Sequence, residues 1–319
     1  MLAAIKHAVS DSATLYIGHF GNGARWAEFV DAADRGVPKS RKWAIAISTQ
    51  VGCPVGCVMC DVGTLNYGGN LDADEMLEQI RHVVRQNPGI NLESHPEIEI
   101  HFTRMGEPSL NRAVLGALKR LAWEMPYPGI TPLISTVAPK SPAIKPFFEE
   151  LLELKENCFS GGRFQLQFSL HATDEAARRR IVPIKKWSLQ DIADYGARFV
   201  GPADRKIVLS FVTVKGGVLD AAFLARTFDP EKFAVKIASV VPTAAAVAHA
   251  DSFEALSPPD PMASALALRR RGFDVIQAAH SPEEIRTQAA CGQVSNRNLR
   301  KKPASVFMDE NFEPAGGFR

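Results

Sequence analysis

The sequence predicts an α/β protein whose main body is a partial (β/α)6 barrel with a short N-terminal β-hairpin extension. Between residues 43 and 278, short apolar runs alternate with longer amphipathic stretches, which is typical of parallel strands joined by helical crossovers. Residues capable of chemistry stand directly after several of the apolar runs, where parallel barrels place their sites. The 319 residues suffice for one large domain and a small extension.

Residues 1–40 are predicted to form the extension. We expect a short helix over residues 2–9, then two strands over residues 13–19 and 24–30. The intervening Gly21-Asn22-Gly23 is a strong hairpin signal. Residues 34–41 are polar and contain Gly and Pro, so we expect a loop there.

The barrel is expected over residues 41–300, followed by a C-terminal tail at 301–319. The first helix is marked by Asp72 as N-cap with Glu75 three residues later, the capping-box pattern. The expected strands are residues 43–47, 97–102, 131–135, 164–169, 206–214, 233–241 and 275–278. The expected helices are residues 71–87, 111–124, 142–154, 174–180, 189–199, 220–227 and 261–271.

Composition excludes several classes of protein. Hydrophobic residues make up 46% and charged residues 23%, as in soluble globular chains, and no apolar run reaches the length of a membrane span. The net charge of +2 does not by itself imply nucleic-acid binding. Basic runs at 178–180, 269–271 and 297–302 are more often solvated faces than RNA footprints. Five cysteines without a secretion signal favour a reducing, cytoplasmic location.

Three of the five cysteines lie close together. Cys53, Cys57 and Cys60 have C-x₃-C-x₂-C spacing in a Gly- and Pro-containing loop after strand 43–47. Structural zinc normally has four ligands, and the next histidine is as distant as His82. A cubane [4Fe–4S] cluster held by three thiolates keeps one iron open to another ligand. The spacing therefore predicts an iron–sulfur site, rather than a chance group of core thiols.

Polar residues also follow three later strands. Gly106 and Glu107 end one strand, Ser135 ends the next, and Ser169-Leu170-His171 end a third. Each alone is more often a turn, a helix cap or a buried structural histidine. Because the carboxyl ends of parallel strands meet at one edge of a sheet, together they favour a ligand site.

The remaining cysteines differ in their surroundings. Cys291 lies in a polar, Gly-containing loop after the last strand, where a reactive thiol is at least as expected as a structural one. Cys158 precedes a strand, which places it at the opposite end of the barrel, and we interpret it as structural.

Taken together, these residues resemble the RlmN/Cfr family of radical SAM RNA methyltransferases. The resemblance runs from about residue 28 to residue 302. It rests on residues 48–60, 105–111, 134–136, 169–172, 181–184 and 289–293.

The resemblance implies a radical SAM barrel and a role for each matching position. The cofactors would be a [4Fe–4S] cluster and S-adenosylmethionine (SAM), whose amino and carboxylate groups the open iron would chelate. Cys291 would accept a methyl group from one SAM, and Glu28 matches the proposed proton acceptor. The cluster ligands would be Cys53, Cys57 and Cys60, and the SAM-binding residues Gly106, Glu107, Ser135, Ser169, Leu170 and His171.

The implied reaction is methylation of an sp² carbon. A second SAM would be cleaved reductively, and its 5′-deoxyadenosyl radical would remove hydrogen from the methyl group on Cys291. The resulting carbon radical would add to an adenine carbon. The implied partners are a flavodoxin- or ferredoxin-type electron donor and an RNA or small-molecule substrate, without a membrane.

The sequence departs from the family at several positions. Seven residues before Cys53 the family has a second cysteine that releases the covalent adduct as a disulfide, and this chain has Ala46. An Asn beside the SAM is replaced by Val241, which cannot donate its hydrogen bonds. Met59 replaces an aromatic residue, and the family's N-terminal RNA-binding domain is expected to be absent because Cys53 comes so early.

These departures leave two alternatives beside methylation. One is a specialised radical SAM enzyme that catalyses a non-methylating reaction on a small molecule. The other is a non-catalytic paralogue that binds SAM or RNA, which the intact cysteine triad disfavours.

Overall fold

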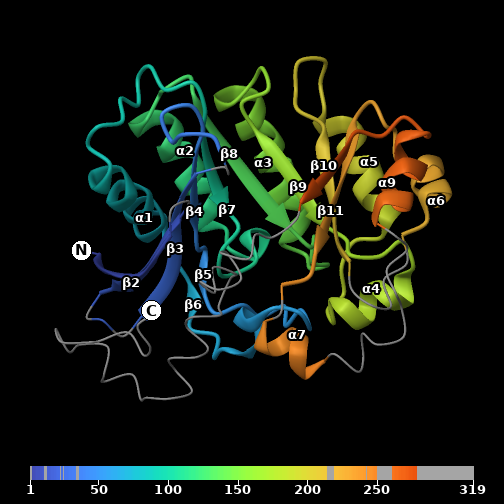
Figure 1. Cartoon of the computed structure of the whole chain (residues 1–319), viewed down its shortest axis with the longest axis horizontal. Helices are drawn as coiled ribbons and strands as arrows, with labels where there is room; N and C mark the ends of the chain where they lie inside the picture. The colour runs from blue at the N-terminus through green and yellow to red at the C-terminus, as the bar shows by residue number, and fades with distance from the viewer. Residues whose placement is uncertain are drawn as a thin grey trace.

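The chain folds around one ten-stranded sheet that curves into an open barrel (Figure 1). The computed structural model describes residues 2–278 apart from 11–12, 22, 24, 34–35, 214–218, 242 and 250–260. The strand order is β1-β2-β3-β4-β7-β8-β9-β10-β11-β12, so sequence neighbours are mostly spatial neighbours. Strands β1 and β12 stand at the two ends of this order, so the sheet does not close. The predicted partial barrel is confirmed.

The first three strands form an antiparallel extension. They are β1 (Ala3–Val9), β2 (Ala13–Phe20) and β3 (Arg25–Ala33). The predicted hairpin of β2 and β3 is confirmed, and Gly21 and Gly23 both adopt positive φ in its turn. The helix predicted over residues 2–9 is wrong, because that segment is strand β1, paired with β2 from Ala3 opposite His19 onward. Pairing along the open edge of β2 outweighs the helix preference of its alanines.

Strand β4 (Trp43–Ile47) joins the extension to the barrel. It pairs antiparallel with β3 on one side and parallel with β7 on the other. All further neighbours are parallel. These strands are β7 (Ile98–Phe102), β8 (Ile130–Thr136), β9 (Gln165–Ser169), β10 (Ile207–Thr213), β11 (Phe233–Ser239) and β12 (Val275–Ala278).

Helices cover the outer face of the parallel strands (Figure 1). The capping box of Asp72 and Glu75 opens α1 as predicted. One short helix after β11, α7, was not predicted. The helices are α1 (Ala73–Gln86), α2 (Ala113–Glu124), α3 (Ile144–Cys158), α4 (Glu175–Ile181), α5 (Leu189–Phe199), α6 (Ala221–Thr227), α7 (Ala244–Ala248) and α9 (Pro261–Arg269).

The core lies between the strands and these helices. On β7, Ile98, Ile100 and Phe102 are buried in it, while Glu99 and His101 alternate onto the other face. Each such large apolar side chain contributes about 1.5–3 kcal/mol when fully buried. The backbone of β7 is therefore fixed from outside, and its opposite face carries polar residues.

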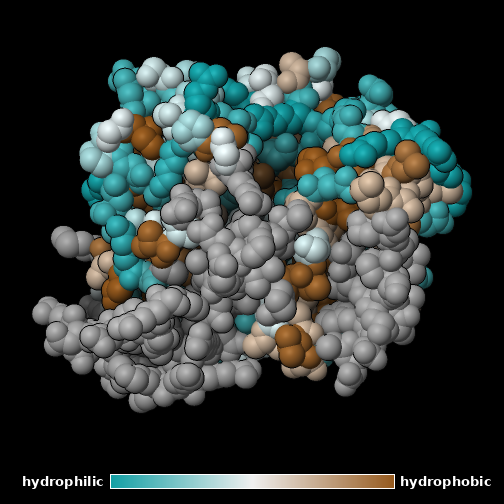
Figure 2. Space-filling view, in the orientation of Figure 1, coloured by the Kyte–Doolittle hydropathy of each residue, from teal (hydrophilic) through white to brown (hydrophobic). Residues whose placement is uncertain are grey.

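On the face seen in Figure 2, the described residues are mostly hydrophilic at the surface, with smaller apolar areas. The exposed apolar residues include Val247 on α7 and Met262 on α9. Among the described residues, no helix is long and apolar enough to cross a bilayer. The predicted tail at 301–319 lies outside the described residues.

Candidate active site

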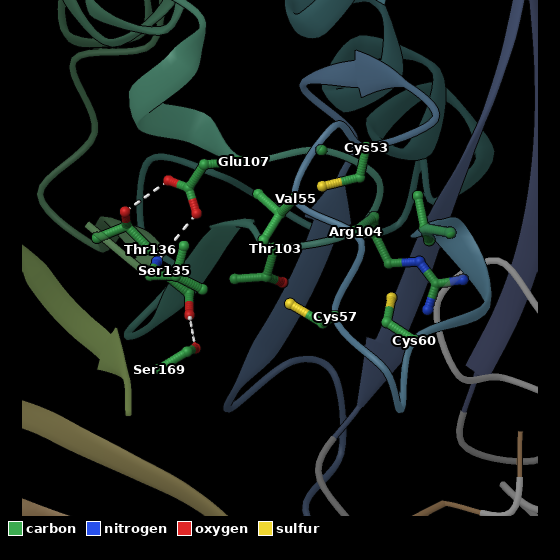
Figure 3. A pocket seen from close by; sticks show the side chains of 13 residues that line it. Cys53, Val55, Cys57, Cys60, Thr103, Arg104, Glu107, Ser135, Thr136 and Ser169 are labelled. Atoms are coloured by element: carbon green, nitrogen blue, oxygen red, sulfur yellow. Dashed lines mark hydrogen bonds between the residues drawn. The ribbon is translucent and has the colours of Figure 1, made fainter. Parts of the chain in front are cut away.

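A cavity of about 130 Å³ opens at the carboxyl ends of the strands from β4 to β9 (Figure 3). Residues from four separate strand-end loops line it, as expected of a parallel barrel. The lining residues are Cys53, Val55, Cys57, Cys60, Val62, Thr103, Arg104, Gly106, Glu107, Ser135, Thr136, Val137 and Ser169.

The three clustered cysteines border this cavity from one loop (Figure 3). All three are reduced cysteines, and the amide of Cys60 donates to the carbonyl of Cys57 at 3.0 Å. Within the described part of the chain, no three His, Cys, Asp or Glu side chains form a set that could hold a single metal ion. A cubane cluster is larger than one ion, so its ligands stand farther apart.

The electrostatics of the loop favour a cationic occupant. Burial and the neighbouring Cys60 and Cys53 raise the pKa of the Cys57 thiol well above its ordinary value, and Glu107 adds to this effect. Three adjacent thiols in such surroundings do not ionise together unless positive charge offsets them. Iron supplies that charge, so the donor set fits a three-cysteine iron–sulfur cluster.

The end of the cysteine loop is anchored to a helix far along the chain. The buried carboxylate of Asp61 accepts hydrogen bonds from the amides of Ala245 at 2.7 Å and Ala244 at 3.3 Å, at the start of α7. The hydroxyl of Thr243 donates to the carbonyl of Met59 at 2.8 Å. These contacts, which sequence reasoning missed, fix the residues on either side of Cys60.

Gly106 brings the end of β7 against the loop that precedes the cysteines. Its φ is +105°, and a Cβ there would lie 2.7 Å from both Thr49 Oγ1 and Gln50 Cβ. The next amide, of Glu107, donates to Gln50 Oε1 at 2.8 Å. Only glycine permits this approach without strain.

Glu107 is buried at the cavity wall and strongly hydrogen-bonded. Its Oε1 accepts from the amide and hydroxyl of Ser109 at 3.1 and 2.7 Å, and also from the hydroxyl of Thr136. Its Oε2 accepts from the amide of Val137 at 2.9 Å. Burial raises the pKa of Glu107, and the bonds from Ser109 and Thr136 oppose that rise. The carboxylate is thus held in one orientation beside the cysteines.

The serines at the ends of the neighbouring strands β8 and β9 lie side by side on one wall of the cavity. Ser135 Oγ and Ser169 Oγ are 3.2 Å apart (Figure 3). Gln167 Nε2 donates to Ser135 Oγ at 3.0 Å. Leu170 and His171 follow Ser169 but are buried against neighbouring elements and do not line the cavity. The structure therefore brings four of the six predicted SAM-binding residues to the cysteines.

His171 has an unusual backbone and a defined tautomer. Its φ is +65°, a left-handed conformation that is uncommon for a residue with a side chain. Nδ1 accepts a hydrogen bond from the amide of Val212 at 3.3 Å, so the neutral ring carries its proton on Nε2. Burial, with Arg178 and Lys186 nearby, lowers the pKa of His171 to about 4.

Glu28 lies in β3 and forms a buried ion pair with a residue that sequence reasoning missed. Arg104 Nη2 donates to Glu28 Oε2 at 2.7 Å, and the two side chains are 7% and 0% exposed. Arg104 follows β7 and lines the cavity, whereas Glu28 does not line it. A charged residue at the end of a predicted barrel strand was the available signal for Arg104.

The remaining predicted positions are dispersed. Cys291 lies outside the described residues. Ala46 is half-buried in β4, paired with Val30 of β3 and His101 of β7. Val241 follows β11, and Cys158 ends α3 at the opposite side of the barrel from the cavity.

Comparison with known proteins shows which proteins this chain resembles. No family model matches the chain. The Geobacter sulfurreducens dual-specificity RNA methyltransferase RlmN is 28% identical over 279 residues, which cover 85% of this chain and 69% of the relative. The RlmN of Helicobacter hepaticus is 27% identical over 181 residues, 56% of this chain and 46% of the relative. The chain is therefore similar to the RlmN proteins over much of its length.

A solved structure supports the fold of this RlmN/Cfr-like chain. The crystal structure of a radical SAM methyltransferase from Sphaerobacter thermophilus superposes with a TM-score of 0.68 at 24% identity, over 92% of this chain and 80% of that one. Among the curated relatives, this chain spans only about half the length of the Helicobacter hepaticus RlmN and of a probable RlmN from Nostoc.

Proposed function

We propose that the chain is a radical SAM enzyme that methylates an sp² carbon of RNA adenine or of a small heteroaromatic substrate. The observation that carries the proposal is one cavity bordered by three reduced cysteines together with Gly106 and Glu107. Its family relatives are named as RNA methyltransferases, which supports the reaction class.

Each residue at the cavity has a defined task in this proposal. Cys53, Cys57 and Cys60 hold a [4Fe–4S] cluster. With SAM bound and one electron from a flavodoxin- or ferredoxin-type donor, this cofactor supplies a 5′-deoxyadenosyl radical. Glu107 accepts a hydrogen bond from the ammonium of SAM, and Gly106 admits SAM close to the backbone.

Residues away from the cysteine loop complete the site. The hydroxyls of Ser135 and Ser169, already aligned with one another, bind polar groups of SAM. Leu170 and His171 support them from the β9 loop, with the Nε2 proton of His171 available as a donor. Glu28 is assigned the role of proton acceptor by its match to the family alone, since it lies outside the cavity in the ion pair with Arg104.

Cys291 is the methyl carrier in the proposed reaction. Its thiolate takes a methyl group from one SAM and releases S-adenosylhomocysteine. A 5′-deoxyadenosyl radical from a second SAM would remove a hydrogen atom from that methyl group and leave as 5′-deoxyadenosine. The carbon radical would then form a C–C bond to the substrate carbon, which would release its proton to the proton acceptor and return one electron to the oxidised cluster. Because Ala46 stands where the family has a thiol, an external thiol releases the adduct by forming a disulfide with Cys291.

Anaerobic reconstitution tests the proposal. The protein is loaded with iron and sulfide and given SAM and dithionite, and 5′-deoxyadenosine and the mass of the Cys291 peptide are measured. We expect both 5′-deoxyadenosine and a peptide heavier by one methyl group, and Cys291→Ala abolishes methylated product. Methylated product from Cys291→Ala would refute methyl carriage.

Ala46 favours a second candidate function, a non-methylating radical reaction on a small molecule. This candidate predicts 5′-deoxyadenosine without any methyl group on Cys291. If no 5′-deoxyadenosine forms even with a fully loaded cluster, the chain is instead a non-catalytic SAM- or RNA-binding paralogue.

A further inference from the structure

The segment after α4 packs directly against the cysteine loop. The amide of Val58 donates to the carbonyl of Ile181 at 3.1 Å. Val55 from the loop and Val182 from the segment share a small apolar cluster, against which Cys57 also packs. The cysteine loop and residues 181–187 therefore form one packed unit, and a charge fixed in the segment acts on the loop at short range.

Lys186 is such a fixed charge. Its Nζ donates to the carbonyls of Val182 at 2.9 Å and Ile184 at 3.2 Å, within its own segment. The backbone on both sides of Lys186 is hydrogen-bonded to the loop that follows β8. Lys140 N donates to Lys185 O and Trp187 N donates to Ala138 O, each at 2.8 Å. The ammonium is thus held in place, unlike a lysine that extends freely into solvent.

Lys186 and its neighbours bring positive charge to the segment that packs on the cysteine loop. Burial and Arg178 lower the pKa of Lys186 to about 8, while Glu175 and Cys57 oppose that decrease and Arg179 adds to it. The ammonium is therefore mainly protonated at pH 7. Arg178 is a second, fully buried cation, and its carboxylate partner Glu175 is 53% exposed, so water screens that carboxylate.

We propose that Lys186 raises the reduction potential of the cluster held by Cys53, Cys57 and Cys60. The inference rests on the proposed function, because it requires the cluster. Reduction brings one electron from the donor to the cluster and makes no bond, so the cluster gains one negative charge. A nearby ammonium stabilises the reduced form more than the oxidised form. Without Lys186, the donor reduces the cluster less completely.

An anaerobic redox titration followed by electron paramagnetic resonance tests this. Wild type, Lys186→Met and Lys185→Met are reconstituted at pH 7 without SAM, and the signal of the reduced cluster is recorded against potential. We expect about a tenfold lower ratio of reduced to oxidised cluster in Lys186→Met at a given potential, a decrease of about 59 mV. Lys185 is the matched control, because it is the neighbouring lysine and is exposed.

A third variant separates charge from structure. Lys186→Arg keeps the positive charge and should keep the wild-type midpoint, with the iron content of each variant measured to verify loading. Equal midpoints for Lys186→Met and wild type would overturn the inference. So would an equal decrease in Lys185→Met or Lys186→Arg, since neither is explained by the charge of Lys186. A failure of the cluster assignment, the part of the proposed function on which this inference rests, looks different, because wild type itself would then give no cluster signal.

Discussion

His171 should make the folded protein sensitive to mild acid. Burial and two nearby cations lower its pKa from the ordinary 6.5 to about 4 in the folded chain. Between these values the unfolded chain binds a proton that the folded chain does not, so lowering the pH favours unfolding. The stabilisation is fully present above pH 6.5 and is lost as the pH falls toward 4. The gap corresponds to about 3 kcal/mol, at about 1.4 kcal/mol per tenfold change in proton affinity.

The variant His171→Asn removes the titrating ring without adding backbone strain. The residue has a φ of +65°, and asparagine tolerates that conformation better than most residues. Urea unfolding of wild type and variant is measured at several pH values between 4 and 7. We expect the stability difference between the two to change by up to about 3 kcal/mol over that range.

A matched control is available elsewhere in the chain. His249 follows α7 and is exposed, so His249→Asn should leave the pH dependence of unfolding unchanged. Parallel stability curves for wild type and His171→Asn would refute the assignment of a depressed pKa to His171.

Three further variants test the site's construction. Gly106→Ala should lower stability by about 1–3 kcal/mol, because the new side chain is strained at φ +105° and its Cβ lies 2.7 Å from neighbouring atoms. The control Gly89→Ala, which has open space around it, should not lower stability, and thermal unfolding compares the two variants. Asp61→Ala should cost about 1–2 kcal/mol and speed hydrogen exchange at the start of α7, and unchanged exchange there would contradict the anchor. Arg104→Met should cost about 3–5 kcal/mol by leaving the buried Glu28 carboxylate without its guanidinium. Adding Glu28→Gln should recover much of that loss in a double-mutant cycle, and strict additivity would argue against the ion pair.

The parallel part of the fold could be predicted because its local signals agree. The strand at Trp43–Ile47 and the helix at Leu189–Phe199 have the predicted bounds, since buried periodicity and capping residues mark both. Strand β1 could not be predicted in the same way. Its alanines favour a helix locally, and only the unpaired edge of β2, a tertiary feature, makes it a strand.

The candidate site could be predicted from the sequence at positions where the residue type indicates one chemical role. Three spaced cysteines indicate a cluster, and their strand-end position places them beside Gly106 and Glu107. Arg104 was missed because an arginine in a sequence does not reveal whether it meets solvent or a buried carboxylate 76 residues away. Cys291, which the reaction requires, stays a prediction.

The anchor between Asp61 and α7 has a consequence for the order in which the protein matures. It joins residues 184 positions apart, so it forms only after the intervening chain, from α1 through β11, has been synthesised and packed. Closing so long a loop is slow compared with forming the local helices. The cysteine loop therefore reaches its final shape late, and iron–sulfur assembly on the nascent chain has to wait until the barrel is nearly complete.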